Sequence, residues 1–578
     1  MTKVFAAHLR ALWGVCARIF FALLVATPSF ALDRDQWRRL LHFDGSKSRV
    51  DGPGFFLSEK GARDPEAELQ ATIQKFRSEP EARCRFPARF ELLEKEFALM
   101  KVACPELDRF HQQMRAQSVS LVFSTAYSNN PGSMFGHTFL RFKTGGPALL
   151  DPTISYAAQV GDGVEPLYVL RGLFGGYRGV LSVVPYHMKV NEYVRSESRD
   201  LFEYELDLSE AERERLLDYF WEIQANAHLD YYFFDENCAS LLLEALNVAR
   251  PGLGLEVRGI HVTPGEAVRA VALAPGLVKR IDYRPSLKRR FEANLENLDE
   301  RQIAEFEKVA LRNDRPEATT DARVIETASL YADYVKDVAR KERLLVRQSE
   351  LPAASEIEIP APPTRPELGH RPYRVEIAAV RGAETESEIS FRPALHDLLD
   401  DDAGFSPHSQ IEMASLALRV GKEFHLERAT LASIVSLVPV SRYEKPLSWQ
   451  LELDSRRLRE CEDCQAAHAR FGGGYAVAFN EQVAYAFVSG QAEVDRSLDR
   501  GHREGPVASL GAIAQLLPNW KLQLRAERWW IVTNELRDEV RVEQAVHLAR
   551  AWDLRFAWTL VNAATDSGEA KLAIGHDF

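Results

Sequence analysis

The sequence predicts an α+β fold followed by an antiparallel β-barrel, and three patterns support this prediction. Apolar residues recur every three to four positions between residue 32 and about residue 117, which is typical of helices. Short apolar segments separated by glycine turns follow, up to about residue 250. After residue 372, about twelve segments alternate in polarity from one residue to the next, which indicates an antiparallel sheet.

Residues 1–31 have the pattern of a signal peptide. Basic residues at Lys3, Arg10 and Arg18 accompany an apolar run at residues 19–26, and a small-x-small sequence ends at Ala31. The apolar run is shorter than the roughly 20 residues that a membrane-spanning helix needs. We therefore expect export with cleavage after Ala31, rather than a membrane anchor.

The cysteines that follow the predicted signal peptide predict disulfides and one free thiol, because exported proteins meet an oxidising compartment. Cys84 and Cys104 bracket a helical segment within the helical N-terminal region, residues 32–117. Cys461 and Cys464 form a Cys-x-x-Cys in a polar stretch. No second pair follows at zinc spacing, so a loop disulfide is favoured over a metal site. Cys238 is then left without a partner.

The sequence of the second half of the chain predicts helices, a linker and the barrel. Residues 251–350 are helical in pattern, and residues 351–372 are rich in proline, as linkers are. Residues 373–578 have strand lengths that suit a tilted membrane strand, and the chain ends at Phe578 with apolar residues at alternate positions before it. This ending favours an outer-membrane barrel, with a soluble barrel or sandwich as the alternative.

Two motifs in residues 118–250 carry the candidate chemistry. Residues 128–142 form a turn followed by a strand that begins at about His137. Residues 233–246 form an aromatic strand end followed by an apolar helix, with Cys238 in its first turn. The intervening segments at residues 183–194 and 201–208 have strand patterns.

A thiol at a helix N-terminus facing a histidine on a strand is the arrangement of a cysteine nucleophile and its base. Cys238 is the candidate nucleophile and His137 the candidate general base. If a glycine turn at residues 145–146 closes a hairpin, Asp151 lies near His137 and orients it, with Ser155 and Tyr156 as alternatives. Backbone N–H groups at the start of the Cys238 helix could bind an oxyanion.

The alternative interpretation of Cys238 is a buried core thiol on an apolar helix. Asp235 and Glu236 precede it, and neighbouring negative charge raises the pKa of a thiol.

Further polar residues crowd the two motifs. The candidate substrate-binding residues are Ser128, Asn129, Asn130, Asn237 and Arg141. The first three could instead simply build the turn. Arg141 and Arg171 could hold a phosphate or carboxylate, although surface charge is the commoner role. His187 and His228 are expected to be structural.

Four strings resemble the DUF4105 domain, also called the Lnb N-terminal periplasmic domain: residues 128–141, 172–177, 185–190 and 231–238. The resemblance covers about residues 118–250 and implies lipoprotein N-acylation, in which an acyl chain moves to the amine of a lipoprotein's N-terminal cysteine. The order of His and Cys is also similar to that of permuted NlpC/P60-like thiol enzymes, of the lecithin:retinol acyltransferase kind, which implies a papain-like fold. The resemblance puts their catalytic roles on Cys238, His137 and Asp151.

Lnb proteins proper follow this domain with transmembrane helices, whereas this chain continues into the predicted barrel. We therefore expect a periplasmic cysteine-dependent acyltransferase or hydrolase, anchored in the outer membrane of a Gram-negative envelope. It would act on a lipid or lipoprotein-like substrate through an acyl-thioester, without a cofactor or metal. The alternatives are a cysteine peptidase or amidase acting on peptidoglycan, and a non-catalytic envelope binding or structural protein. A net charge of −12 argues against nucleic-acid binding.

Overall fold

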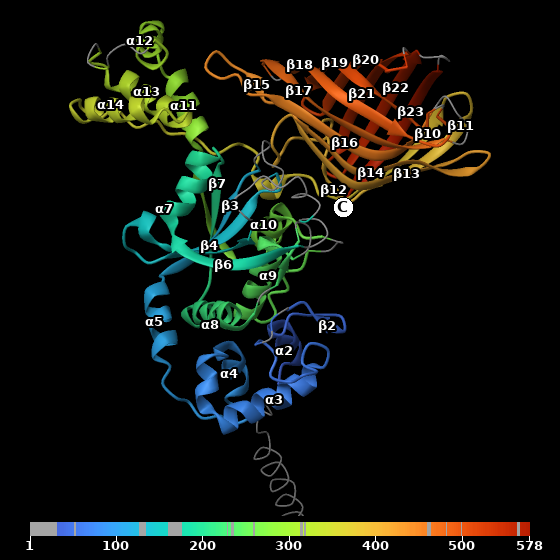
Figure 1. Ribbon diagram of the computed structural model, residues 1–578. Helices are drawn as coiled ribbons and strands as arrows, with labels where there is room; N and C mark the ends of the chain where they lie inside the picture. The colour runs from blue at the N-terminus through green and yellow to red at the C-terminus, as the bar shows by residue number, and fades with distance from the viewer. Residues whose placement is uncertain are drawn as a thin grey trace, which may run out of the picture. The chain divides into compact units, whose positions relative to one another are not determined.

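The computed structural model describes residues 32–578, except 51, 53, 127–133, 160–170, 172–175, 228, 233–235, 258–260, 313–315, 317–318, 459–463, 481, 499, 534 and 563–566. The predicted signal peptide lies outside this range. The described residues form two compact units (Figure 1). The first contains the chain up to Arg115 together with Ser209–Leu229 and Glu244–Gly254, and the second contains the rest.

The first unit is helical, as the apolar spacing predicts. Aspartate or serine caps start three of its helices, and proline occupies the first turn of α3, α4 and α5. A short hairpin, β1 with β2, interrupts the helices. The helices are α2 (Arg34–Leu40), α3 (Pro65–Ser78), α4 (Pro87–Leu93), α5 (Pro105–Met114) and α8 (Glu210–Asn226).

A buried arginine joins the helices of the first unit. The guanidinium of Arg89 on α4 pairs with Glu68 on α3 at 2.7 Å and with Glu222 on α8 at 2.6 Å. Burial raises the pKa of Glu222 to about 7 and also raises the pKa of Glu68. One arginine shared by two buried carboxylates thus holds together helices from both ends of the unit's sequence.

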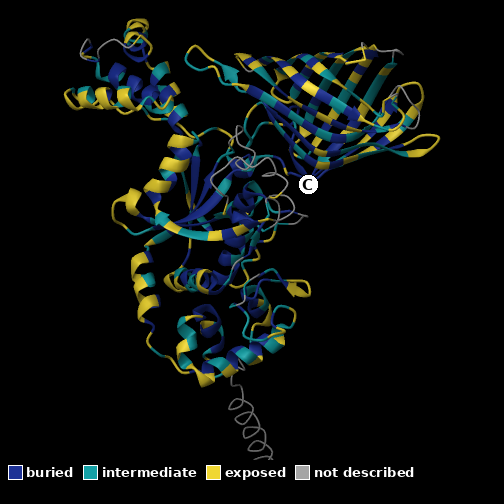
Figure 2. Cartoon of the chain, in the orientation of Figure 1, coloured by how far each residue is buried: buried dark blue, intermediate teal, exposed yellow. Residues whose placement is uncertain are grey.

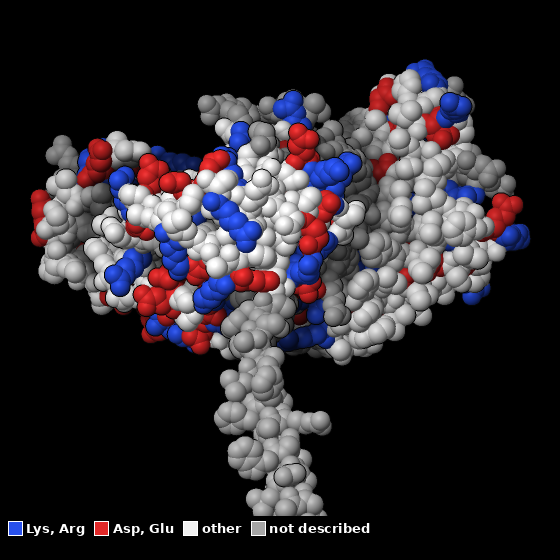
Figure 3. Space-filling view, turned by 90° about the horizontal axis from the view of Figure 1, so that it is seen from below, with Lys and Arg blue, Asp and Glu red and all other residues white. Residues whose placement is uncertain are grey.

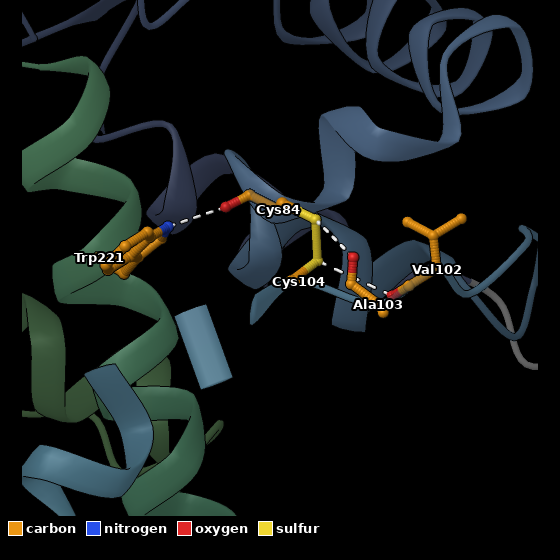
Figure 4. The surroundings of a disulfide bond; sticks show 5 residues. All are labelled: Cys84, Val102, Ala103, Cys104 and Trp221. Atoms are coloured by element: carbon orange, nitrogen blue, oxygen red, sulfur yellow. Dashed lines mark hydrogen bonds between the residues drawn. A yellow bond between two sulfur atoms is a disulfide. The ribbon is translucent and has the colours of Figure 1, made fainter. Parts of the chain in front are cut away.

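The predicted Cys84–Cys104 disulfide is present (Figure 4). It joins the end of the 3₁₀ helix η1 (Pro80–Cys84) to the residue before α5. The indole N–H of Trp221 on α8 donates to the carbonyl of Cys84 at 2.8 Å. The bridge therefore fixes the irregular segment between α4 and α5 next to α8.

Removing this bridge should loosen the segment that it closes. The disulfide spans 20 residues, and a loop of this size stabilises a fold by about 3 kcal/mol. We expect a Cys84→Ser/Cys104→Ser variant to show faster amide hydrogen exchange across residues 85–103, with unfolding of the first unit easier by about 2–4 kcal/mol. Unchanged exchange in these peptides would contradict this role for the bridge.

On the face shown in Figure 3, acidic and basic side chains are intermingled, and its described residues form no large area of one sign.

The second unit begins with a seven-stranded antiparallel sheet of order β8-β6-β5-β4-β3-β7-β9. Figure 1 shows α9 (Cys238–Ala249) and α10 (Pro264–Leu273) beside it. β9 lies beyond residue 250, where the sequence predicts the domain to end, and pairs with β7. The strands are β3 (Ser118–Ser124), β4 (His137–Lys143), β5 (Pro152–Ala158), β6 (Tyr177–Pro185), β7 (Leu201–Leu206), β8 (Asp230–Tyr231) and β9 (Val278–Arg284).

The strand predicted at residues 183–194 is wrong after its first three residues. The strand β6 ends at Pro185, and a helical segment follows, α7 (Tyr186–Lys189) with the π-helix η4 (Val190–Ser196). Tyr186, Tyr193 and Val194 recur at near-helical spacing and pack on Phe139 of β4 and its neighbours. Packing on one face of the sheet decided the conformation, and the β propensity of valine and tyrosine did not.

A helical group, α11 (Leu287–Glu296), α12 (Glu300–Ala310), α13 (Ala322–Tyr334) and α14 (Val338–Ser349), has its own apolar core. The predicted linker then contains only the short 3₁₀ helix η6 (Pro366–Leu368) as regular structure. Within the described ranges, no helix is both long and apolar enough to cross a membrane.

The last 200 residues form a closed antiparallel barrel of twelve strands, as predicted. Each strand pairs with the next along the chain, β10 pairs with β23, and β11 pairs with β13 across the short β12. The strands are β10 (Arg374–Arg381), β11 (Thr385–Arg392), β13 (Ser409–Val420), β14 (Phe424–Ser436), β16 (Ser448–Arg457), β17 (Gln465–Phe479), β18 (Gln482–Val494), β19 (His502–Leu517), β20 (Trp520–Trp530), β21 (Leu536–Ala549), β22 (Trp552–Asn562) and β23 (Ser567–Asp577).

Buried and exposed residues alternate along the barrel strands (Figure 2), and the exposed residues include many large apolar ones whereas many buried ones are charged. Leu510, Leu524 and Ile574 are exposed on the outside. Inside, ion pairs such as Arg470–Glu527 at 2.7 Å line a cavity of about 360 Å³. An apolar belt around a polar lumen is the pattern of a barrel that meets lipid.

Candidate functional site

Cys238 is the first residue of α9, as the sequence predicts. Asn237 caps this helix: its side-chain oxygen accepts from the N–H groups of Ala239 at 2.9 Å and Ser240 at 3.2 Å. Its amide nitrogen donates to the carbonyl of Val262 at 2.6 Å. Asn237 is predicted to bind substrate, but the structure gives it a capping role and places the thiol at the positive end of the helix dipole.

Cys238 is buried beside polar groups of Thr138 and Tyr231. It is 1% exposed, and burial raises its pKa, whereas the neighbouring polar groups of Thr138 and Tyr231 act in the opposite direction. The N–H of Cys238 donates to the Tyr231 hydroxyl at 3.4 Å, and the Thr138 hydroxyl has no hydrogen-bond partner among the described residues.

The pairing of β4 with β5 ends just before Thr138, which explains how Thr138 reaches the sulfur. The pairing of β4 with β5 covers Phe139, Leu140 and Arg141 only. The N–H of Thr138 lies one residue beyond this ladder, so it is available to the sulfur. The start of α9 therefore meets β4 at the position next to His137.

His137 is held by Ser155 on the neighbouring strand. Its Nε2 lies 3.0 Å from the Ser155 hydroxyl. Burial lowers the pKa of His137 to about 3, and the positive charges of Lys189 and Arg199 act in the same direction. The imidazole is therefore neutral. If Nε2–H donates to Ser155, Nδ1 carries the lone pair that a general base needs.

Tyr193 lies beside His137. Its ring centroid lies 5.7 Å from that of His137. Burial raises the pKa of Tyr193 well above its ordinary value, and the neighbouring carboxylate of Glu192 adds to the effect. Within the described part of the chain, the imidazole bonds to Ser155 and not directly to the sulfur.

Asp151, the predicted orienting residue, is not beside His137. It bonds to Arg141 at 2.7 Å and to the N–H and hydroxyl of Thr144 at 2.9 Å each. It precedes β5 and lies four residues from Ser155, about 13 Å along an extended chain. The short helix at 148–150 that follows the glycine turn shifts the register. Ser155, the first alternative, occupies the predicted position.

Arg141 is a structural residue in this geometry. It is 6% exposed, and its guanidinium pairs with Asp151 and with Glu203 at 2.8 Å. It also lies over the ring of Tyr186, 4.2 Å from the centroid. The structure therefore does not bring Arg141 to the thiol as a substrate-binding residue.

Several predicted residues fall elsewhere or outside the described ranges. Tyr156 stacks near Tyr231, with ring centroids 5.6 Å apart, and His187 is exposed. Arg171 is exposed as well. Cys464 is disulfide-bonded. Ser128, Asn129, Asn130, His228 and Cys461 lie outside the described residues.

Three site residues were missed by the sequence analysis: Thr138, Tyr231 and Tyr193. Thr138 and Tyr231 lie inside the strings that carry the resemblance, next to His137 and seven residues before Cys238. Their position in those strings was a usable signal. Tyr193 gave no usable signal, because the sequence of its segment resembled a strand.

The different roles of Asp151 and Ser155 predict different costs of substitution. Asp151→Asn should lower the unfolding free energy by about 2–3 kcal/mol, because it weakens a buried ion pair. Ser155→Ala should cost about 1 kcal/mol, the value of one hydrogen bond. Urea unfolding of the detergent-solubilised chain measures both. A larger loss for Ser155→Ala would contradict this assignment.

Comparison with known families agrees with the motifs. Residues 106–272 match the Lnb N-terminal periplasmic domain. Residues 32–96 match a domain of unknown function, DUF7843, and residues 363–576 match another, DUF7840. The resemblance inferred from the motifs is therefore confirmed, and it covers the strands β3 to β8, α9 and most of α10.

Solved structures similar to this chain include porins and an outer membrane channel. They include the KdgM porin (6% identity, TM-score 0.23, covering 36% of this chain and 99% of that one). An anion-selective porin from Comamonas acidovorans (10%, 0.19, 36% and 98%) is also similar, as is the COG4313 outer membrane channel from Pseudomonas putida F1 (10%, 0.25, 39% and 100%). No curated protein matches the chain.

The location of the chain follows from two features. The closed twelve-stranded barrel has an apolar outside, as a lipid-facing barrel requires. The family matched by residues 106–272 is a periplasmic domain. Together they support an outer-membrane location with a periplasmic α/β region.

Proposed function

We propose that the chain is a cysteine-dependent acyltransferase or hydrolase of the envelope that acts on a lipid or lipoprotein-like substrate. The observation that carries the proposal is the position of Cys238 at the start of α9 beside Thr138, the residue that follows a histidine held by Ser155. A nucleophile, a base and an orienting group are the parts that an acyl-enzyme reaction needs. The papain-like arrangement implied by the resemblance forms part of this proposal.

The proposed reaction starts with transfer of the Cys238 proton to Nδ1 of His137, while the Nε2–H group of His137 keeps its hydrogen bond to Ser155. The thiolate attacks an ester or amide carbonyl of the substrate, and N–H groups at the start of α9 stabilise the oxyanion. His137 returns the proton to the departing alcohol or amine, which leaves an acyl-thioester on Cys238. An amine or water then takes the acyl group and restores the thiol.

Burial sets a condition on this reaction. Because Cys238 is 1% exposed, substrate binding has to uncover the sulfur. The raised pKa of the thiol and the lowered pKa of the imidazole both favour the neutral pair while the pocket is closed. The same two facts favour the second candidate function, a non-catalytic envelope protein in which Cys238 is a core residue.

The mass of the intact protein purified from membranes separates these candidates. We expect wild type to carry an acyl adduct that hydroxylamine removes, because a thioester is labile to it. Cys238→Ser should lack the adduct, and His137→Ala should lower its occupancy by about 100-fold or more, the contribution of a general base. His187→Ala, at an exposed histidine of the same domain, should behave as wild type.

A wild-type protein without any adduct, even after incubation with phospholipid or diacylated peptide, would reject the acyl-enzyme proposal. An adduct with the mass of a peptidoglycan peptide would support the peptidase alternative instead. An adduct that persists in Cys238→Ser would place the chemistry at another residue.

A further inference from the structure

Two histidines and an aspartate lie close together in the part of the chain that forms the first strands of the barrel. His370 lies four residues before β10, His396 ends the short strand β12 (Ala394–His396), and Asp400 follows in the loop that leads to β13. All three are buried, with exposures of 8%, 1% and 2%. Buried histidine and carboxylate side chains in contact are the usual ligands of a divalent transition metal.

The three ligand atoms have the spacing of a metal site. Nε2 of His370 lies 2.9 Å from Nδ1 of His396, and these atoms lie 3.6 Å and 3.7 Å from Oδ2 of Asp400. A point equidistant from all three lies about 2.0 Å from each, which is the length of a Zn–N or Zn–O bond. That point lies in the plane of the three atoms, so an ion that also binds a water out of this plane requires small movements of the side chains.

The hydrogen-bond partners of the two histidines give an independent reason to expect a bound cation. Nδ1 of His370 lies 2.7 Å from the Arg371 carbonyl, so it is the protonated nitrogen and Nε2 is an acceptor. Nδ1 of His396 would then have to donate to it, which leaves Nε2 of His396 as an acceptor. That nitrogen is buried, lies 3.5 Å from the Asp402 carboxylate and has no hydrogen bond within the described residues. Nε2 of His396 and the Asp402 carboxylate would therefore face each other as two hydrogen-bond acceptors.

A metal ion removes this mismatch. With the ion on Nε2 of His370 and Nδ1 of His396, both outer nitrogens carry protons. These protons point to the Arg371 carbonyl and the Asp402 carboxylate, which are the usual outer partners of a metal-bound histidine. Nε2 of His396 then serves Asp402 as a donor.

The surroundings hold the ligands in place. Oδ2 of Asp400 accepts from Arg392 at 2.7 Å and from the N–H of Asp397 at 2.9 Å, and Oδ1 accepts from Arg555. Both guanidinium groups also pair with Asp397, and Arg555 pairs with Asp553 as well. The ring of Phe405 stacks on both imidazoles, with centroids 4.5 and 4.6 Å away, and forms an apolar wall.

We propose that His370, His396 and Asp400 bind a divalent transition metal of the Zn²⁺ type, with water in the fourth position. The ion would tie the chain before β10 to the loop after β12, and so fix the segment that crosses between β11 and β13. This site is independent of the Cys238 chemistry.

Metal binding to the full chain tests the proposal. Detergent-purified protein is dialysed against a chelator and then against Zn²⁺ or Co²⁺. We expect about one tightly bound metal per chain, with Co²⁺ giving the visible absorption of a four-coordinate His/carboxylate site. His370→Ala and His396→Ala should each lose the metal. Asp402→Asn should weaken binding by about 10-fold, because it removes an outer partner.

The control is His468→Ala. His468 is buried beside Asp454 and Glu452, but that group offers only one imidazole, so its loss should leave metal content unchanged. Gel migration of unheated protein checks that each barrel is folded. Wild type without stoichiometric metal and without a Co²⁺ spectrum would overturn the proposal, and would mean that a proton on His396 satisfies the pocket. Metal lost equally in His468→Ala would overturn it too.

Discussion

The antiparallel register of β3, β4 and β5 is the constraint on which the candidate site depends. Pairing of Phe139 with Ser155 puts the serine hydroxyl within reach of His137. The same ladder stops before Thr138, which leaves an N–H for the Cys238 sulfur. A shift of one residue would turn every one of these side chains to the other face of the sheet. Strand register, and not proximity in sequence, assembles the nucleophile with its base.

Burial is the second determinant of the site, and it acts against the charged pair. Desolvation raises the pKa of the thiol and lowers that of the imidazole, so proton transfer between them is disfavoured in the closed pocket. The neighbouring polar groups of Thr138 and Tyr231 act in the opposite direction. A thiol kept neutral until substrate displaces the surrounding groups would be protected from oxidation in the periplasm. Reactivity would then depend on opening of the pocket.

Sequence patterns predicted the parts that depend on local chemistry. Alternating polarity gave the twelve barrel strands, the apolar run after Asn237 gave the helix start at Cys238, and two cysteines around a helical segment gave the disulfide. The third site residue could not be fixed in this way. Asp151 and Ser155 lie on one segment, and the short helix at 148–150 decides which of them meets His137. The helix at Tyr193 was missed because packing against Phe139 overrides its strand-like composition.

The most direct test of the pairing of Cys238 with His137 is the alkylation rate of the thiol in the folded chain. Cys84, Cys104 and Cys464 are disulfide-bonded, so iodoacetamide reports mainly on Cys238. With phospholipid present to open the pocket, we predict that wild type is alkylated without denaturant. The rate should fall about 100-fold in His137→Ala and stay unchanged in His187→Ala. Alkylation that occurs only after denaturation, or at the same rate without His137, would contradict the pairing and leave Cys238 as a core residue.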